Sequence, residues 1–97
     1  MKRVSVLEPV FYTFKFYLKA MTFPQYRKLE GFQRYYEIRD DRTFVEVTVM
    51  NGKINSSEIV VTQFPEMLRI KDMLNQEWNY RLMEDAEIEL YFGKDKS

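Results

Sequence analysis

An Asn-Gly pair at positions 51 and 52 is the feature that most constrains the fold of this chain. Both residues tolerate the positive φ angles of a type I′ turn, which joins two neighbouring antiparallel strands. The preceding stretch, TFVEVTVM, alternates in the way a half-buried strand does. The sequence therefore predicts a β-hairpin at this turn, and the side chains expected to face the core are Thr43, Val45, Val47 and Val49.

The register of this hairpin can also be predicted. A strict two-residue turn places Glu58 opposite Val45, which would bury a carboxylate against valine. One extra residue at Ser56 and Ser57 would instead bring Ile59 opposite Val45, because a slip by one residue moves every side chain to the other face. We therefore predict a bulge at Ser56 and Ser57, or a longer loop.

Other segments also have the two-residue period of strands. Residues 10–21, VFYTFKFYLKAM, alternate over the longest stretch, and RVSVL before them forms a shorter candidate at residues 3–8. GFQRYYEIRDD places Tyr36 and Ile38 on one face. Residues 86–93, AEIELYFG, place Ile88, Leu90 and Phe92 on one face. These patterns predict three or four further strands.

Two Phe-Pro pairs mark the expected starts of helices. Thr22 and Gln25 have the spacing of a capping box around Pro24, which predicts a short helix at about residues 23–30. Phe64-Pro65-Glu66 opens a helix predicted at about residues 65–83. Its apolar stripe, at spacings of three and four, consists of Met67, Ile70, Leu74, Trp78 and Leu82, with Met73 beside it. A duplication could also explain the two similar starts.

The expected fold class is α+β. The predicted order of elements along the chain is β-β-α-β-β-β-α-β, in one domain covering residues 1–97 with a frayed tail at residues 94–97. A mainly antiparallel sheet of five or six strands would have the long helix packed on one face. Ninety-seven residues with 16% aromatics suffice for one hydrophobic core.

The composition excludes several classes of chemistry. The chain has no cysteine and no histidine, so it lacks disulfides, thiolate metal sites, a Cys nucleophile and the commonest general base. We expect no catalytic residues, no cofactor and no metal site. A metal-dependent phosphodiesterase that uses Glu87 and Glu89 on one strand face is a distant alternative.

Charge is distributed unevenly along the chain. The formal net charge is zero, which argues against a general polyanion binder. Residues 1–39 hold eight basic and three acidic residues, a balance of +5, and residues 40–97 carry −5. This asymmetry indicates a surface for a partner.

The N-terminal sequence indicates where the chain works. Glu8 and Pro9 interrupt the apolar stretch after MKRVSVL, which is too short for the core of a signal peptide. Nothing in the sequence approaches the length of a membrane span. We expect a soluble cytoplasmic protein without a membrane partner.

The function that the sequence favours is binding of a macromolecule without catalysis. Tyr, Met, Trp and Arg are enriched at the cores of protein interfaces, and the chain holds seven Tyr and six Met. We expect a protein–protein interaction module or an inhibitor, with a homodimer as one form, of the kind that a phage or mobile element encodes against a host machine.

Binding of single-stranded nucleic acid is the alternative. A sheet face that displays aromatic rings among cations can stack bases and follow phosphates. Under either hypothesis the candidate binding residues are Lys15, Tyr17, Lys19, Arg27, Lys28, Tyr35 and Arg39.

Overall fold

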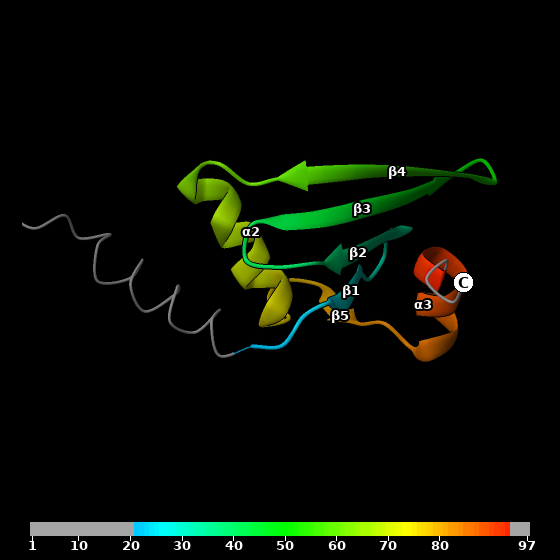
Figure 1. Cartoon of the computed structure of the whole chain (residues 1–97). Coiled ribbons are helices and arrows are strands. Elements are labelled where there is room, and N and C mark those ends of the chain that lie inside the picture. Colours follow the sequence, from blue (N-terminus) through cyan, green and yellow to red (C-terminus); the bar gives the residue numbers. More distant parts are fainter. Residues whose placement is uncertain (1–20, 94–97) are drawn as a thin grey trace, which may run out of the picture.

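The computed structural model describes residues 21–93 of the 97-residue chain, and these form an α+β unit with one antiparallel sheet and two helices (Figure 1). The predicted strand at residues 3–8, all but the last residue of the predicted strand at residues 10–21, and the predicted frayed tail lie outside the described residues. The elements are β1 (Gln25–Leu29), β2 (Arg34–Ile38), β3 (Thr43–Met50), β4 (Lys53–Val60), α2 (Phe64–Leu74), β5 (Tyr80–Leu82) and α3 (Asp85–Phe92).

The sheet has five strands in the order β4-β3-β2-β1-β5, and every neighbouring pair is antiparallel. The predicted hairpin is confirmed: Asn51 and Gly52 have φ angles of 51° and 77°, as a type I′ turn requires. α2 and α3 contact opposite faces of the sheet, because they pack against side chains that alternate along β2 and β3.

The larger hydrophobic cluster lies between α2 and the sheet. Tyr36, Ile38 and Phe44 project from β2 and β3 against the buried stripe of α2. The Tyr36 hydroxyl donates to Glu46 at 2.8 Å, so the polar end of this buried ring is satisfied. The residues of α2 that complete the cluster are Met67, Ile70, Met73 and Leu74.

The smaller cluster lies between α3 and the other face. Val45 and Val47 of β3 are buried there together with Met83 and Phe92. The predicted inward valines of β3 are therefore buried as expected at these two positions, but Phe44 on the opposite face is buried as well. A strand with a helix on each face is apolar on both sides, which simple alternation does not reveal.

The bulge predicted at Ser56 and Ser57 is not formed. β3 and β4 pair without interruption, with Glu58 opposite Val45 and Ser56 opposite Val47. The Glu58 carboxylate is not buried in this register, because β4 is an edge strand and Glu58 is exposed. Arg39 contacts it instead, with 3.0 Å between Nη1 and Oε2.

The predicted helix at residues 65–83 is also wrong in its length, since α2 ends at Leu74. The N–H of Gln76 donates to Met73 O at 3.1 Å and that of Glu77 to Asp72 O at 2.8 Å. These two bonds form a Schellman motif, in which Gln76 takes the left-handed position with a φ of 58°. Glycine usually occupies that position, so the sequence lacks the common signal for the end of a helix.

The segment predicted as a short helix at residues 23–30 contains β1 instead. β1 lies between β2 and β5 and pairs with both, so its backbone groups are satisfied by the sheet. Gln25 does not complete a capping box, because its side chain donates to Thr22 O at 2.9 Å. Tertiary pairing therefore prevails over a local helix signal.

The segment predicted as a strand at residues 86–93 forms the helix α3. Glu84 precedes it, and its N–H donates to the Glu87 carboxylate at 2.9 Å, as in a capping box. The turn signal at residues 84–87 therefore starts a helix, and the apolar alternation that follows is misleading. Ile88, Tyr91 and Phe92 face the sheet from α3.

Arg27 joins β1 to the end of α2 and is only 6% exposed. Its Nε donates to Met73 O at 2.9 Å and its Nη2 to Leu74 O at 3.2 Å. The same guanidinium donates to Tyr26 O and to the Gln25 side chain, at 2.9 and 2.8 Å. A buried cation thereby donates to the last two carbonyls of α2, of which Met73 O also accepts from Gln76.

Replacement of Gln76 by glycine tests where α2 ends. Glycine adopts the left-handed conformation without strain, so Gln76→Gly should raise the free energy of unfolding by about 1 kcal/mol in urea denaturation. Lys71→Gly, inside α2, should lower it by about 1 kcal/mol. A loss of stability in Gln76→Gly would show that the helix continues through residue 76.

Removal of the Arg27 guanidinium should destabilise the fold. Arg27→Met removes the Arg27 donor from Leu74 O and one of two donors from Met73 O, and we expect a loss of about 2 kcal/mol. The matched control is Arg34→Met at an exposed position of β2, which should change stability by less than about 0.5 kcal/mol. Equal losses in the two variants would contradict this role of Arg27.

Candidate protein-binding surface

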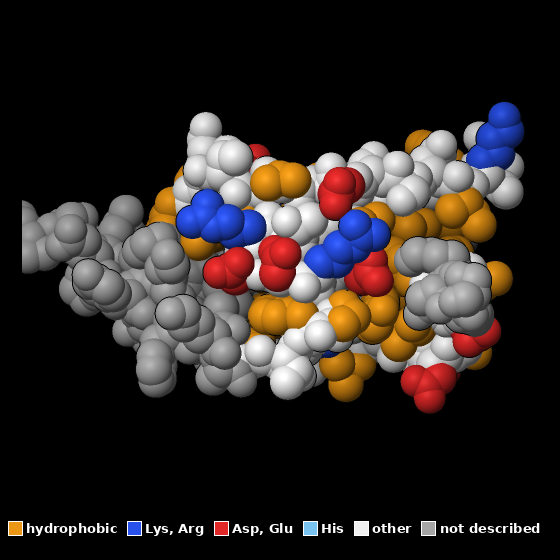
Figure 2. Space-filling view, viewed as in Figure 1, with side chains coloured by type: hydrophobic (Ala, Val, Ile, Leu, Met, Phe, Trp, Pro, Cys, Tyr) orange, Lys and Arg blue, Asp and Glu red, His pale blue; other side chains and the backbone are white. Residues whose placement is uncertain are grey.

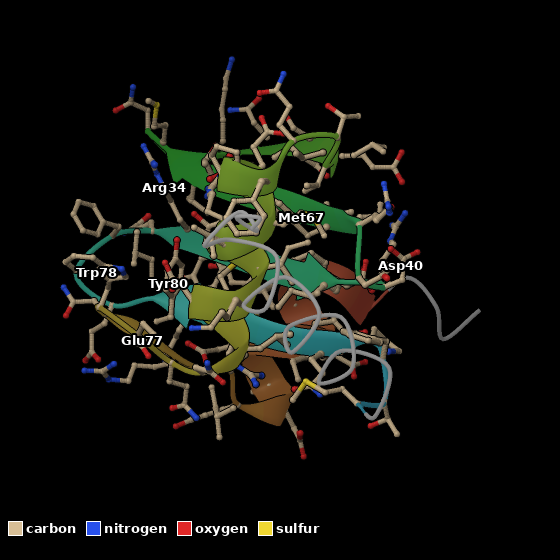
Figure 3. All side chains as sticks on the ribbon, turned by 90° about the vertical axis from the view of Figure 1, so that its left-hand side faces the viewer. Arg34, Asp40, Met67, Glu77, Trp78 and Tyr80 are labelled. Carbon is tan, nitrogen blue, oxygen red and sulfur yellow. The ribbon has the colours of Figure 1, made fainter. Side chains whose placement is uncertain are left out.

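The loop between α2 and β5 holds Trp78 in solvent. The side chain is 79% exposed and its backbone has a φ of 58°. A left-handed conformation is uncommon for a bulky residue and costs on the order of 1–3 kcal/mol, so surrounding contacts must hold it. Figure 3 shows Trp78 at the rim of the molecule, beside Glu77 and on the opposite side from Asp40.

Hydrogen bonds on both sides of Trp78 fix the loop. The N–H of Tyr80 donates to Glu77 O at 3.1 Å, and the N–H of Glu30 donates to Asn79 O at 2.8 Å. Arg81 Nη1 donates to Trp78 O at 3.2 Å and to Tyr80 O at 2.9 Å. The backbone around the exposed ring is therefore ordered before any partner arrives.

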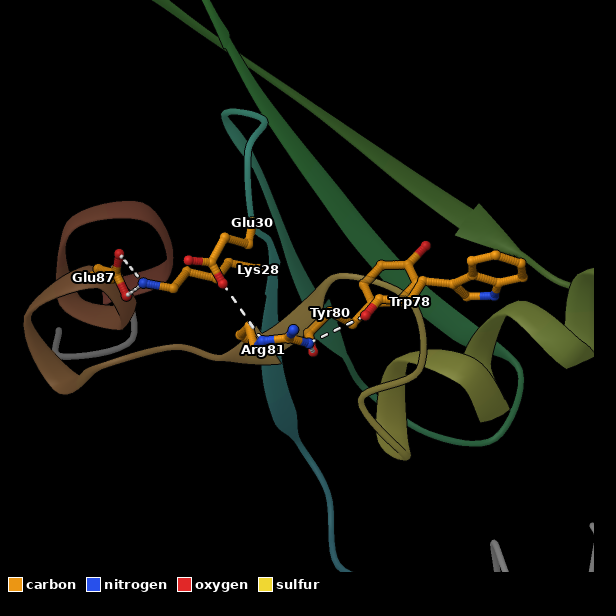
Figure 4. A network of polar contacts seen from close by, with 6 residues as sticks. All are labelled: Lys28, Glu30, Trp78, Tyr80, Arg81 and Glu87. Carbon is orange, nitrogen blue, oxygen red and sulfur yellow. Dashed lines mark hydrogen bonds and ion pairs between the residues drawn. The ribbon is translucent and has the colours of Figure 1, made fainter.

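Arg81 connects this loop to the neighbouring turn, as Figure 4 shows. Its Nε lies 3.4 Å from Glu30 Oε1, and both side chains are substantially exposed. An ion pair of this kind contributes little to stability, at most about 1 kcal/mol. Its effect is positional, since it holds in place the guanidinium that donates to the Trp78 carbonyl.

Buried residues anchor the two ends of the loop. Leu74 belongs to the large cluster, and Tyr80 packs edge-on against Tyr36 with 5.7 Å between ring centroids. Within the described part of the chain, the indole makes one long polar contact, from Nε1 to Asp72 Oδ2 at 3.4 Å. Trp78 is thus held outward between two residues that are fixed in the core.

Segments that adjoin the tryptophan loop carry exposed apolar and charged side chains. Phe32 is 58% exposed, in the turn that meets the tryptophan loop through the bond from Glu30 to Asn79. Leu82 of β5 is 56% exposed. Glu77, Arg81 and Glu30 provide charges around them. Apolar anchors within a polar rim are the usual composition of a protein-binding patch.

The residues that the sequence predicted for binding do not form one surface in the described part of the chain. Lys15, Tyr17 and Lys19 lie outside it. Arg27 is buried on the α2 face, and Lys28, which follows it, projects from the α3 face.

Lys28 forms an ion pair with α3. Its Nζ lies 3.0 Å from Glu87 Oε2 and 3.1 Å from Oε1. This contact raises the pKa of Lys28 above its ordinary value. The pKa of Glu87 is lowered, first by the bond from the Glu84 N–H and then by Lys28.

Tyr35 and Arg39 also contact side chains of their own face. Tyr35 stacks on Tyr91 of α3 with 4.1 Å between ring centroids, and the hydrogen bond with Tyr91 together with burial raises the pKa of Tyr35 to about 12. Arg39 lies between Glu37 and Glu58, at 2.9 and 3.0 Å. Figure 2 shows basic and acidic side chains side by side in this way. The cations of this face are therefore balanced by carboxylates.

The acidic residues that suggested a metal site are arranged differently from the prediction. Glu87 and Glu89 lie on the helix α3, not on one face of a strand, and the Glu87 carboxylate accepts bonds from Lys28 and Glu84. Within residues 21–93, no three acidic residues come together as ligands for a metal ion.

Comparisons with known proteins give no relatives: no family model, no characterised protein and no solved structure matches the chain significantly. The helices of residues 21–93 are too short or too polar to cross a membrane.

Sequence reasoning assigned Trp78 to the buried stripe of a long helix and so missed it as a surface residue. Its spacing from Ile70 and Leu74 fits a helical period, which is why the prediction failed. Asn75 and Asn79 on either side are residues that favour turns, and they are the signal that could have placed Trp78 in a loop.

The contact between Lys28 and Glu87 predicts how stability depends on pH. Because the pKa of Glu87 is lowered in the folded state, its contribution is present above the ordinary glutamate range and is lost as the pH falls through the folded pKa. Glu87→Gln should lower stability by about 0.5 kcal/mol at neutral pH. The difference from the wild type should close between about pH 5 and 3.

Urea denaturation across this pH range provides the measurement. Glu77→Gln is the same substitution in the exposed loop, away from Lys28. Its difference from the wild type in free energy of unfolding should not follow the pH dependence that the Lys28 contact gives to Glu87→Gln. A Glu87→Gln difference that persists unchanged at pH 3 would show that the carboxylate does not act through its charge.

Proposed function

We propose that this chain is a protein-binding module whose central contact is Trp78. The observation that carries the proposal is the exposed indole on an ordered, left-handed backbone. Tryptophan is among the residues that contribute most to binding at protein interfaces. A side chain on a backbone that is already ordered costs less conformational entropy to bind than one on a flexible loop.

The chemistry around Trp78 favours a protein as the partner. Phe32 and Leu82 add apolar surface, and Glu30 and Arg81 add charges of both signs that can be matched by a partner's side chains. A partner of this kind presents an apolar pocket wide enough for an indole. Inhibition of an enzyme or of an assembly through such a pocket is one form that this function can take.

The nucleic-acid hypothesis has less support from the described residues. Lys28 and Arg39 are paired with carboxylates, and Tyr35 is stacked on Tyr91. A strand of nucleic acid on this face would have to displace these contacts. The hypothesis stays a prediction, and the experiment below separates it from protein binding.

Replacement of Trp78 should abolish binding without unfolding the chain. We expect that proteins retained by the wild-type chain from nuclease-treated lysate are lost with Trp78→Ala, by at least about tenfold, because a central aromatic contributes 2 kcal/mol or more at an interface. The free energy of unfolding should change by less than about 0.5 kcal/mol, since the ring is exposed.

Leu90→Ala is the matched control, because Leu90 is also an exposed apolar residue but lies on α3. It should retain the partner. Trp78 is the chain's one tryptophan, so titration with the purified partner should shift its fluorescence to shorter wavelength. Equal retention by Trp78→Ala and the wild type would refute the proposal. Retention of nucleic acid that weakens steeply with salt would favour the alternative.

A further inference from the structure

The strand β4 forms a long open edge of the sheet. It has eight residues and stands last in the sheet order, so among the strands of residues 21–93 only β3 pairs with it. Its pairing with β3 is continuous, and it contains neither a proline nor a bulge that would discourage another strand. The opposite edge, β5, has only three residues.

The backbone of β4 has hydrogen-bonding groups available on the outer side. Met50 and Lys53 flank the two-residue turn and form the first hydrogen-bonded pair, so bonded pairs recur at every second residue. The N–H and C=O groups that point away from β3 therefore belong to Ile54, Ser56, Glu58 and Val60.

Two of the four residues whose backbone groups point outward, Ile54 and Val60, have apolar side chains. Ile54 is 56% exposed and Val60 is 59% exposed, near opposite ends of β4. They share one face, because they pair with Val49 and Thr43, which lie on the same face as Val45. A strand added to this edge would cover both.

We propose that β4 pairs antiparallel with β4 of a second copy of this chain, about a two-fold axis at Ser57. In this register Ser57 lies opposite Ser57, and Ile54 of each copy lies opposite Val60 of the other. The pair of Ile54 and Val60 therefore occurs twice, once on each side of the axis, and each exposed apolar side chain is covered by its partner. The outward N–H and C=O groups of the two copies can form hydrogen bonds with each other, because Ile54 pairs with Val60 and Ser56 with Glu58, and all four residues have outward backbone groups.

The neighbouring registers are less favourable. An axis at Ser56 places Ile54 opposite Glu58, and an axis at Glu58 brings two carboxylates together. With the axis at Ser57, Glu58 faces Ser56, and Arg39 already neutralises it from within its own copy at 3.0 Å. The pattern of apolar and charged residues therefore selects one register as well as one partner.

Cross-linking tests the register directly. Residues directly opposite each other have Cβ atoms about 4.5–5.5 Å apart, which a disulfide can bridge after a small adjustment. Ser57→Cys in this cysteine-free chain should oxidise to a disulfide-linked dimer. Ser56→Cys is the matched control, because its copies lie on a diagonal and should not bridge. Efficient linkage of Ser56→Cys instead would overturn the register.

The mass of the unmodified chain tests the dimer itself. Sedimentation should show the mass rising toward that of two chains with concentration. Ser56→Pro removes an outward N–H without affecting a bond to β3, so it should leave a folded monomer by circular dichroism, whereas Ser56→Ala should remain dimeric. A monomeric mass for the wild type across the series would overturn the proposal. Trp78→Ala should still dimerise, so failure of this inference is distinguishable from failure of the proposed function.

Discussion

The buried guanidinium of Arg27 is the interaction on which the arrangement of the two helices depends. It donates to the last carbonyls of α2 from β1, the strand next to the β5 edge, with 2.9 Å between Nε and Met73 O. The next residue, Lys28, points to the other face and pairs with Glu87 of α3. Two consecutive residues of β1 thus hold one helix on each side, and the side-chain period of a strand separates them. The buried member contributes more than the exposed one, because its bonds to Met73 O and Leu74 O are buried.

The position of the tryptophan loop follows from that anchor. Arg27 fixes where α2 ends, and the Schellman motif turns the chain back toward β1, where Tyr80 enters the core. Between these two fixed points residues 75–79 are exposed to solvent, and Trp78 is the largest of them. The strained backbone at Trp78 therefore results from the demands of packing on both sides, and the exposed ring is its consequence.

Local turn chemistry could be predicted from the sequence, whereas tertiary choices could not. Asn51 and Gly52 determine their hairpin by backbone preference alone. The alternation at Ile88 and Leu90 predicted a strand. The helix start formed by Glu84 and Glu87 lies outside that alternation and was not recognised. The helical spacing of Trp78 continued beyond the true end of α2, where no glycine marks the stop. The exposure that makes Trp78 a candidate contact depends on where β5 docks, which no local pattern contains.

The tryptophan loop and the open strand β4 belong to opposite edges of one sheet. Two copies joined at β4 would form a sheet of ten strands, with an indole near each far end, roughly 40 Å apart at the usual spacing of strands. Such a pair would be bivalent. A target that carries two such pockets at a matching distance would dissociate much more slowly than a target with a single pocket. The reason is that the second contact forms at a high effective concentration. Selection by spacing would then add to selection by the shape of one pocket.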